Sequence, residues 1–432
     1  MFKNLISEIN LHPKGLFVLF YTELWERFSY YGMRAILVLY IVSSQDAVNP
    51  GLGWSNLEAL KFYGWYTALV YFACIPGGII SDRLIGKKKS VLYGGFLLCI
   101  GHLILAISQI FFFFTGILLI IIGVGLLKPN ISSLVGNLYK KSDKKRDQGF
   151  TIFYIGINIG AFLSSLIVGF IGEKYGWHYG FSLAGLGMIS GQFIYIKGLD
   201  DIKEFKQEKT NNKKILSFTK IEIDRIKLLI LSFLLIIVFW ASFEQAGGLM
   251  NLYAFEKTDR IISILNDWQL PASWFQSINP LLIILLGIPI STFWIKRNFS
   301  SLFKMSVGIM IMGFGFIFMY FASIEFNKNG ISSMYWLFLA YLFHTVGELC
   351  ASPVVLSFIT KLSPLKSLST IMGIYFATIG LGNKFAGSIG EYSQKFGETE
   401  TFLGITITCT SFGLIILLFL KKLNNLSHGA DK

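Results

Sequence analysis

Charged residues are scarce in this sequence. Asp, Glu, Lys and Arg make up only 15% of its 432 residues, whereas soluble globular proteins have about 25%. The chain is instead 53% hydrophobic and 16% aromatic, and apolar runs of about 18 residues or more recur along its whole length. The composition therefore excludes a soluble protein and predicts a polytopic helical membrane protein.

Cysteine and catalytic motifs are scarce as well. The sequence has four cysteines, all inside apolar runs and with no Cys-x-x-Cys pair: Cys74, Cys99, Cys350 and Cys409. This pattern excludes a disulfide framework and a cysteine zinc site. We find no His-Glu-x-x-His, Gly-x-Ser-x-Gly or phosphate-binding loop motif, and no Gly-x-Gly-x-x-Gly beside a predicted strand. We therefore expect a protein that is not an enzyme and that needs no metal and no organic cofactor.

The apolar runs predict twelve transmembrane helices, near residues 16–42, 56–81, 88–110, 112–139, 147–170, 178–197, 227–256, 273–295, 302–324, 333–360, 367–392 and 401–421. The longest polar interval, residues 198–226, separates the first six from the last six. It has charges of both signs, which is typical of a flexible linker. We predict an N-terminal six-helix bundle (1–197), a cytoplasmic linker (198–226) and a C-terminal six-helix bundle (227–432).

The net charge of +13 reflects membrane topology. Lys and Arg are concentrated in the N-terminus, the C-terminus and the loops after the even-numbered helices, while the loops after the odd-numbered helices have few. By the positive-inside rule, we expect a multi-pass protein of the cell (inner or plasma) membrane with both termini in the cytoplasm. The basic residues therefore do not indicate a nucleic-acid partner.

Charged and tyrosine side chains interrupt the first apolar run: Glu23, Glu26, Arg27, Tyr30, Tyr31 and Arg34. At about 100° per residue, all six fall within an arc of about 140° on one side of a helix. A charge at bilayer depth costs roughly 2.5–3.5 kcal/mol, so charges persist there mainly inside the protein or in a wet cavity. The pattern indicates a titratable stripe, as a proton-coupled transport pathway requires.

Four further charged residues lie in later apolar runs: Lys128, Glu244, Glu348 and Lys384. At about 3 kcal/mol each, the eight charges would cost about 24 kcal/mol if unpaired, which exceeds the stability of a whole domain. Static ion pairs between helices are one explanation. Buried pairs, however, stabilise poorly relative to apolar packing, so we favour pairing, protonation or hydration that changes during a transport cycle.

One loop and two helices resemble the major facilitator superfamily. The loop Gly77-Gly78-Ile-Ile-Ser-Asp82-Arg83-Leu-Ile-Gly86-Lys87-Lys88-Lys89 is similar to its conserved cytoplasmic loop, which implies a gating role for Asp82 and Arg83. A plain basic cytoplasmic loop is the alternative. Small-residue stretches in the fifth and eleventh predicted helices also echo each other, and two parallel six-helix halves are the arrangement of the major facilitator fold.

Six motifs, in order along the chain, resemble the proton-dependent oligopeptide transporter (POT/PTR) family of that superfamily. They are Glu23-x-x-Glu26-Arg27-Phe28-x-Tyr30-Tyr31-Gly32, Leu127-Lys128-Pro129-Asn130-Ile131-Ser132, Phe153-Tyr154-Ile-Gly-Ile-Asn158-Ile-Gly-Ala161, Phe239-Trp240-Ala-Ser-Phe-Glu244-Gln245, Phe275-Gln276-Ser-Ile-Asn279-Pro280 and Gly347-Glu348-Leu-Cys-Ala-Ser352-Pro353. The resemblance covers nearly every predicted helix. It implies a symporter that imports di- and tripeptides with protons by alternating access.

The resemblance also implies roles for individual residues. Arg34 and Lys128 would hold the carboxylate end of the peptide and Glu348 its ammonium end through charge-assisted contacts. Other residues would line the pocket: Tyr30, Tyr31, Tyr71, Asn158, Trp240, Asn279 and Ser352. Protonation would be coupled to movement at Glu23, Glu26, Arg27 and Glu244, because a carboxylate that alternates between desolvation and pairing with a cation has two different pKa values.

The sequence departs from the family pattern at three places. Many bacterial members have two additional helices between the halves, which the interval 198–226 is too short to contain. Tyr375 stands where the family usually has Trp, and Lys384 stands where an apolar residue is usual. The departures at Tyr375 and Lys384 affect the preference for particular peptide side chains, which the sequence does not identify. They do not affect the class of transporter.

Charge also suggests a gate. We expect Arg34 to pair with Glu244 on the outer side and Lys128 with Glu348 on the inner side. Rocking of the two halves would make one pair as it breaks the other, and a bound peptide would compete for Lys128 and Glu348.

Two other functions remain open from the sequence. A family member could carry another substrate, such as nitrate, an amino acid or a peptide-like compound. A membrane sensor could bind peptide without moving it, although a sensor has no need of the charged motif in the first helix.

Overall fold

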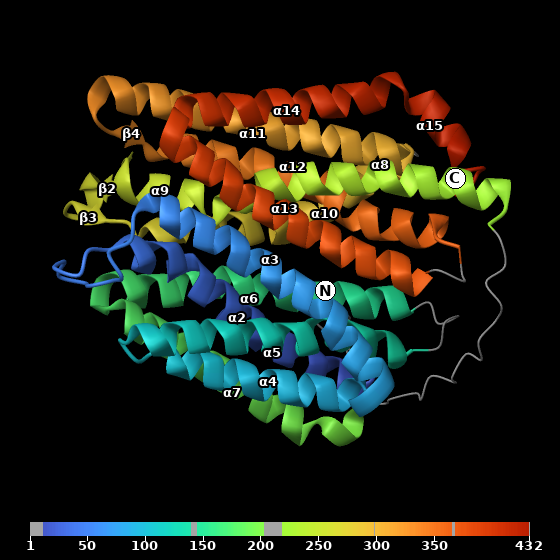
Figure 1. Cartoon of the computed structure of the whole chain (residues 1–432), viewed down its shortest axis with the longest axis horizontal. Coiled ribbons are helices and arrows are strands. Elements are labelled where there is room, and N and C mark those ends of the chain that lie inside the picture. Colours follow the sequence, from blue (N-terminus) through green and yellow to red (C-terminus); the bar gives the residue numbers. More distant parts are fainter. Residues whose placement is uncertain (1–11, 140–144, 203–217, 298, 365–367, 432) are drawn as a thin grey trace. The chain divides into compact units, whose positions relative to one another are not determined.

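The computed structural model describes residues 12–139, 145–202, 218–297, 299–364 and 368–431, and it is mainly helical (Figure 1). In the first half of the chain the α-helices are α2 (Lys14–Val42), α3 (Asn56–Ile80), α4 (Lys87–Ile104), α5 (Ile110–Asn137), α6 (Lys145–Tyr175) and α7 (Trp177–Lys197). In the second half they are α8 (Lys220–Phe243), α9 (Leu249–Glu256), α10 (Ile278–Arg297), α11 (Ser301–Asn329), α12 (Met334–Leu362), α13 (Leu368–Phe396), α14 (Glu398–Leu418) and α15 (Leu420–Leu426).

Shorter elements connect these helices. A π-helical turn covers Ser81–Ile85, and 3₁₀ turns cover Leu199–Asp201, Glu244–Ala246, Ser263–Leu265 and Ala272–Ser277. Strand β1 (Thr258–Asp259) pairs in parallel with β4 (Ser332–Ser333), and β2 (Ile261–Ile262) pairs antiparallel with β3 (Trp268–Gln269). The sequence pattern did not predict these strands, because two-residue strands have no periodicity to recognise.

Among the described residues, eight helical segments are long and apolar enough to cross a membrane: Asn56–Ile85, Ile110–Asn137, Gln148–Tyr175, Lys220–Glu256, Ala272–Trp294, Ser301–Asn329, Met334–Leu362 and Glu398–Leu418. These segments agree with the predicted polytopic helical membrane protein. The 29-residue helix α2 is not among them. It contains two glutamates and two arginines in its central turns, which are the residues that the sequence singles out.

The predicted helix 227–256 falls within the apolar helical segment Lys220–Glu256, but this segment is interrupted. Helix α8 ends at Phe243, a 3₁₀ turn covers Glu244–Ala246, and α9 begins at Leu249. Gly247 and Gly248 lie at the break, and the backbone of Gly248 has φ −107° and ψ −100°, outside the helical region. Glycine lowers helix stability by about 1 kcal/mol per residue, so two in succession favour an interruption.

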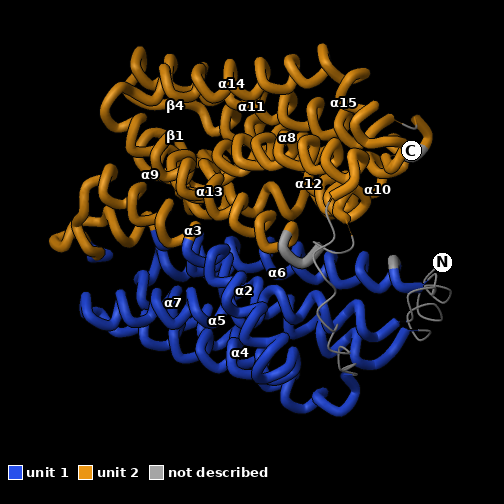
Figure 2. Tube along the Cα trace, turned by 45° about the vertical axis from the view of Figure 1, so that its right-hand side comes forward, with its two compact units in different colours: residues 1–37, 48–50, 69–211 blue, residues 38–47, 51–68, 212–432 orange. Residues whose placement is uncertain are grey.

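The described chain forms two compact units (Figure 2). Unit 1 comprises residues 1–37, 48–50 and 69–211, and unit 2 comprises residues 38–47, 51–68 and 212–432. The last turn of α2 and the first half of α3 therefore pack within unit 2. Residues 203–217 of the predicted linker lie outside the described residues, and the division at 198–226 stays a prediction.

In unit 1, small residues bring the helices close together. A Cβ atom on Gly160 of α6 would meet the backbone of Leu24 in α2 and would lie 3.1 Å from the Cβ atom of Arg27. A Cβ atom on Gly125 of α5 would lie 2.6 Å from the carbonyl oxygen of Ala73 in α3. Such small-residue contacts allow close approach of membrane helices, and they fix the backbones that carry the charged residues.

In unit 2, α3 and α13 make a similar contact. A Cβ atom on Gly64 would lie 2.6 Å from the Cα atom of Gly387. One turn away, the Asn383 amide donates a hydrogen bond of 3.4 Å to the carbonyl oxygen of Thr67. Helix α3 therefore contributes its first half to the packing of unit 2.

Candidate functional site

The charged residues of α2 form a buried ion-pair cluster in unit 1. Arg27 Nε lies 2.9 Å from Glu23 Oε1 and 2.5 Å from Glu26 Oε2. Arg27, Glu23 and Glu26 are 3%, 3% and 0% exposed, respectively. One guanidinium thus faces two carboxylates in a place that water scarcely reaches. Because two anions share one cation, protonation of one carboxylate would leave a neutral pair.

The tyrosines of the same helix stand between its two arginines. The Arg27 Cζ atom lies 5.5 Å from the centroid of the Tyr30 ring, and Arg34 Cζ lies 5.1 Å from that of Tyr31. The two rings meet edge to face at 5.4 Å. Arg34 is 8% exposed. Cation–π contacts of this kind are worth about 2 kcal/mol or more when desolvated, so the tyrosines stabilise both cations inside the protein.

Three further predicted residues of unit 1 have local contacts. The ammonium nitrogen of Lys128 on α5 lies 3.9 Å from the centroid of the Tyr71 ring on α3. Asn158 on α6 is 5% exposed and donates its amide N–H to the carbonyl oxygen of Tyr154, one turn earlier, at 2.9 Å. Lys128 and Tyr71 are thus brought together. The predicted role of Asn158 in the substrate pocket stays a prediction.

Unit 2 holds the predicted acid of α12 in a polar contact. The side-chain amide of Asn279, on α10, donates hydrogen bonds to Glu348 Oε2 at 2.8 Å and to the Thr345 hydroxyl at 3.1 Å. Thr345 in turn donates to the carbonyl oxygen of Tyr341 at 2.7 Å. Glu348 is 8% exposed. Two residues predicted separately, Asn279 and Glu348, therefore form one hydrogen-bonded pair.

The second acid of unit 2 lies at the helix break described above. The hydroxyl of Tyr63, on α3, donates a hydrogen bond of 3.1 Å to Glu244 Oε2. Glu244 is 2% exposed and Tyr63 is 1% exposed. The sequence analysis missed Tyr63. Its partner is 181 residues away, and a tyrosine in an apolar run gives no sequence signal of such a contact.

Trp240 and Ser352 share a small cavity in unit 2. Trp240 on α8 and Ser352 on α12 both line it, and so does Tyr375 on α13. The Trp240 ring packs edge to face on Phe239 and Phe243, at 5.7 and 5.3 Å between centroids. The position of Tyr375, which departs from the family pattern, is therefore beside two predicted pocket residues.

The predicted gating residues Asp82 and Arg83 lie in the π-helical turn after α3, and both are exposed. Gly86 ends this turn with φ +80°, a conformation that favours glycine. The basic residues that follow tie unit 1 together: Lys87 donates to the Ser133 hydroxyl at 2.6 Å, and Lys88 donates to the carbonyl oxygen of Leu199 at 2.9 Å. The gating role of Asp82 and Arg83 stays a prediction.

Lys384 on α13 has polar partners on its own helix. Its ammonium donates to the Ser388 hydroxyl at 2.9 Å and lies 3.6 Å from Glu391 Oε1. It also lies 5.1 Å from the centroid of the Trp65 ring on α3. The charge of Lys384 is therefore compensated inside unit 2, although the sequence shows it as an isolated charge in an apolar run.

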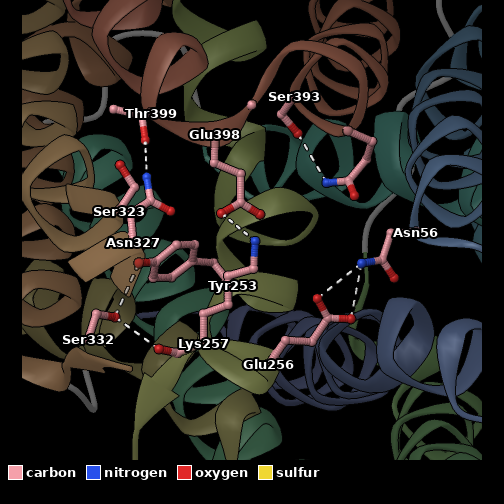
Figure 3. A network of polar contacts seen from close by, with 12 residues as sticks. Asn56, Tyr253, Glu256, Lys257, Ser323, Asn327, Ser332, Ser393, Glu398 and Thr399 are labelled. Atoms are coloured by element: carbon pink, nitrogen blue, oxygen red, sulfur yellow. Dashed lines mark hydrogen bonds and ion pairs between the residues drawn. The ribbon is translucent and has the colours of Figure 1, made fainter. Parts of the chain in front are cut away.

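A polar network surrounds the start of α14 and the end of α9 in unit 2 (Figure 3). Lys257 forms an ion pair of 2.9 Å with Glu398, and the Asn56 amide donates to both carboxylate oxygens of Glu256 at 3.0 Å. The Tyr253 hydroxyl donates to Ser332 at 3.2 Å. None of these residues was predicted. In the described part of the chain, no group of three or more His, Cys, Asp or Glu side chains could hold a metal ion.

The predicted substrate-binding and proton-coupling residues thus fall into two sets. Unit 1 contains Glu23, Glu26, Arg27, Tyr30, Tyr31, Arg34, Tyr71, Lys128 and Asn158, and unit 2 contains Trp240, Glu244, Asn279, Glu348 and Ser352. The set in unit 1 has three cations and two carboxylates, and the set in unit 2 has two carboxylates. The gate hypothesis pairs residues of different units, and it stays a prediction.

Comparison with known proteins places this chain among transporters. The model of the POT family matches residues 88–221 and 199–404. The chain is 36% identical over 476 residues to the uncharacterised transporter YclF of Bacillus subtilis (strain 168). This match covers 94% of this chain and 93% of that protein. The chain is 33% identical over 478 residues to a di-/tripeptide transporter of Lactococcus lactis subsp. cremoris, with 95% and 96% covered.

A solved structure is similar in fold and sequence. The crystal structure of a mutant of the peptide transporter POT in complex with alafosfalin matches with a TM-score of 0.88 and 33% identity. The match covers 96% of each chain.

Proposed function

Because the chain belongs to the POT family of transporters, we propose that it is a proton-coupled symporter that imports di- and tripeptides by alternating access. The observation that carries this proposal is the 33% identity with a di-/tripeptide transporter over 95% of the chain. The buried cluster of Arg27 with two glutamates supports it, since charges are costly at membrane depth and persist where they serve a function.

We propose a major facilitator layout of twelve transmembrane helices, six in each half, in the cell membrane with both termini in the cytoplasm. Its support is that the described residues contain twelve α-helices of 18 residues or more, α2 to α8 and α10 to α14. In this layout α9 continues the seventh helix after the break at Gly247 and Gly248. The positive-inside pattern supports the orientation.

We propose substrate contacts in which each charged residue binds the peptide end of opposite charge. Arg34 and Lys128 attract the peptide carboxylate, and Glu348 attracts the ammonium. The tyrosine contacts of Arg34 and Lys128 and the Asn279 contact of Glu348 support these roles, because they hold the charged groups in defined positions. Interactions with the invariant peptide ends, rather than with side chains, would allow many different peptides to be carried.

Coupling would work through the cluster on α2, with no cofactor besides the transported proton. Arg27 lies against both Glu23 and Glu26, so one buried guanidinium serves two carboxylates. When movement or a substrate draws Arg27 away from one of them, that buried carboxylate favours its protonated form. Glu244 would act similarly at the break between α8 and α9, where the Tyr63 hydroxyl donates a hydrogen bond to it.

The experiment that tests this function is uptake of a labelled dipeptide into liposomes containing the purified protein, with and without an inward proton gradient. We expect concentrative uptake only with the gradient. Uptake that merely equilibrates under both conditions would contradict symport, and binding without uptake would indicate a sensor. Competition by unlabelled nitrate or a single amino acid, but not by dipeptides, would indicate a different substrate.

A further inference from the structure

A large apolar groove lies between α10, α11 and α12 in unit 2. It has a volume of about 520 Å³, and no residue assigned to transport lines it. Val307 and Ile311 of α11 and Val346 of α12 are among its lining residues. Since all three helices belong to segments apolar enough to cross a membrane, the groove opens where lipid chains are its neighbours.

One end of the groove is aromatic. Phe299 stacks on Phe303 with 4.4 Å between ring centroids, and Trp294 lies 5.9 Å from Phe299. Trp side chains are enriched where the bilayer meets water, so this end of the groove lies at the level of the lipid headgroups. From Phe303 to Ile311, α11 rises by about 12 Å at 1.5 Å per residue, which is enough to accommodate part of an acyl chain.

Basic side chains border the aromatic end. The Arg297 guanidinium lies 5.8 Å from the Phe293 ring centroid, and the Lys304 ammonium lies 6.0 Å from that of Trp294. Lys304 is half-buried, whereas Arg297 is exposed at the last turn of α10. These cations therefore stand over the rings that close the groove.

Helix α15 brings further positive charge to the same end of unit 2. Its Asn424 amide donates to the Ser300 hydroxyl at 3.3 Å, immediately before α11, and Lys421 and Lys422 on this helix are both exposed. One acid is close: Asp431 accepts hydrogen bonds from the backbone and the hydroxyl of the first residue of α11. Its charge is engaged at the helix N-terminus, and the basic residues outnumber it. Figure 2 labels α10 and α15 at the same end of unit 2.

We propose that this groove binds one anionic phospholipid of the cytoplasmic leaflet, with an acyl chain against α11 and the phosphate at Arg297 and Lys304. The apolar groove would hold the acyl chain, and the aromatic end would lie at the boundary between chain and headgroup. The basic border would face the phosphate. Basic pockets between membrane helices are a known way to bind anionic headgroups.

The test uses the purified full-length protein and native mass spectrometry. Phosphatidylglycerol and phosphatidylcholine with identical acyl chains are added separately, and the protein with one bound lipid is quantified. We expect one phosphatidylglycerol to be retained more strongly than phosphatidylcholine. Equal retention would overturn the proposal. The measurement does not use transport, so its failure would leave the proposed symport intact, and failure of symport would leave this result standing.

Matched variants locate the lipid. Arg297→Ala and Lys304→Ala should each reduce the retention of phosphatidylglycerol roughly fivefold, as expected for one basic residue near an anionic surface, and should leave phosphatidylcholine unchanged. Lys304→Arg should restore the retention. Lys197→Ala is the control, because Lys197 is an exposed lysine 4.2 Å from the centroid of an aromatic ring, that of Phe193, in unit 1. An equal loss in this control would overturn the assignment to the groove.

A substitution that fills the groove tests the acyl chain. Val307→Trp should reduce the retention of phosphatidylglycerol as well, since the bulky side chain would occupy the space of the chain. Retention unchanged by this variant would overturn the groove as the binding site. Glycerol phosphate, which has the headgroup chemistry and no chain, should not displace the lipid. Displacement by it would identify a site for free phosphate compounds and would likewise overturn the proposal.

Discussion

The substitution Glu26→Gln tests the coupling mechanism. Glu26 is fully buried and shares Arg27 with Glu23; the Arg27 Nε atom lies 2.5 Å from Glu26 and 2.9 Å from Glu23. Glutamine has nearly the same shape as a protonated glutamate and cannot release a proton. In the variant, Arg27 keeps Glu23 as an ion-pair partner, which leaves one cation paired with one carboxylate, so the fold is expected to persist. The variant should therefore exchange peptide without moving a proton.

The size of the effect follows from the gradient. A pH difference of two units stores about 2.7 kcal/mol per proton, at 1.36 kcal/mol per unit. Coupling of one proton to one neutral peptide then permits an accumulation of about 100-fold, because 1.4 kcal/mol corresponds to a factor of ten. An uncoupled carrier permits no accumulation above the outside concentration. The variant should thus fall from a large accumulation ratio to a ratio of about one.

The assay is uptake of labelled dipeptide into liposomes, followed by counterflow on the same preparation. Counterflow needs only exchange of the loaded carrier, so it should remain near the wild-type rate in Glu26→Gln. Glu58→Gln is the control, because Glu58 is an exposed acid at the start of α3 whose carboxylate accepts hydrogen bonds from Ser55. If Glu26→Gln still concentrates peptide under the gradient, the role assigned to this cluster is wrong.

Three other predictions concern single contacts. N-acetylated dipeptides lack the ammonium and should compete at least about tenfold more weakly than unmodified ones, since a charge-assisted contact is worth about 1.5–3 kcal/mol. Glu348→Gln should abolish this discrimination, and equal competition against the wild type would remove Glu348 from the site. Tyr63→Phe removes the 3.1 Å hydrogen bond to the buried Glu244 and should lower Tm in a thermal unfolding experiment, whereas Tyr179→Phe, at a residue that is 66% exposed, should not. An unchanged Tm for Tyr63→Phe would show that this bond adds nothing to stability. Gly64→Ala should strongly reduce dipeptide uptake, because its Cβ atom would lie 2.6 Å from the Cα atom of Gly387. Gly373→Ala is the control and should transport normally, because its Cβ atom would have no neighbouring atom within 4 Å. Equal uptake by the two variants would refute the close contact of α3 with α13.

The sequence predicted the α2 cluster well because its signal is local. Residues three and four apart lie on one side of a helix, so the helical period alone places Glu23, Glu26, Arg27 and Tyr30 on a common face. Helix α2 begins at Lys14 and ends at Val42, close to the predicted 16–42. Charges in an apolar run are likewise visible in the sequence, which is why Lys128, Glu244 and Glu348 were singled out.

The contacts between distant segments could not be predicted. Nothing in the sequence around Tyr63 indicates that its hydroxyl bonds to Glu244, and the close approach of Gly64 to Gly387 depends on the packing of α3 against α13. The break at Gly247 and Gly248 was not predicted, because the apolar run of residues 227–256 continues through both glycines. Likewise, Lys384 seemed isolated because its partners Ser388 and Glu391 and the Trp65 ring are identified only by the folded helix and its neighbour.

Coupled movement of peptide and proton can be tested by reversing the usual driving force. Liposomes containing the purified protein and a pH-sensitive dye are prepared with equal pH on both sides and a clamped membrane potential. Addition of a dipeptide outside should then acidify the lumen, because the entering peptide carries protons with it. Entry of labelled dipeptide with no change in the luminal pH would contradict proton-coupled symport.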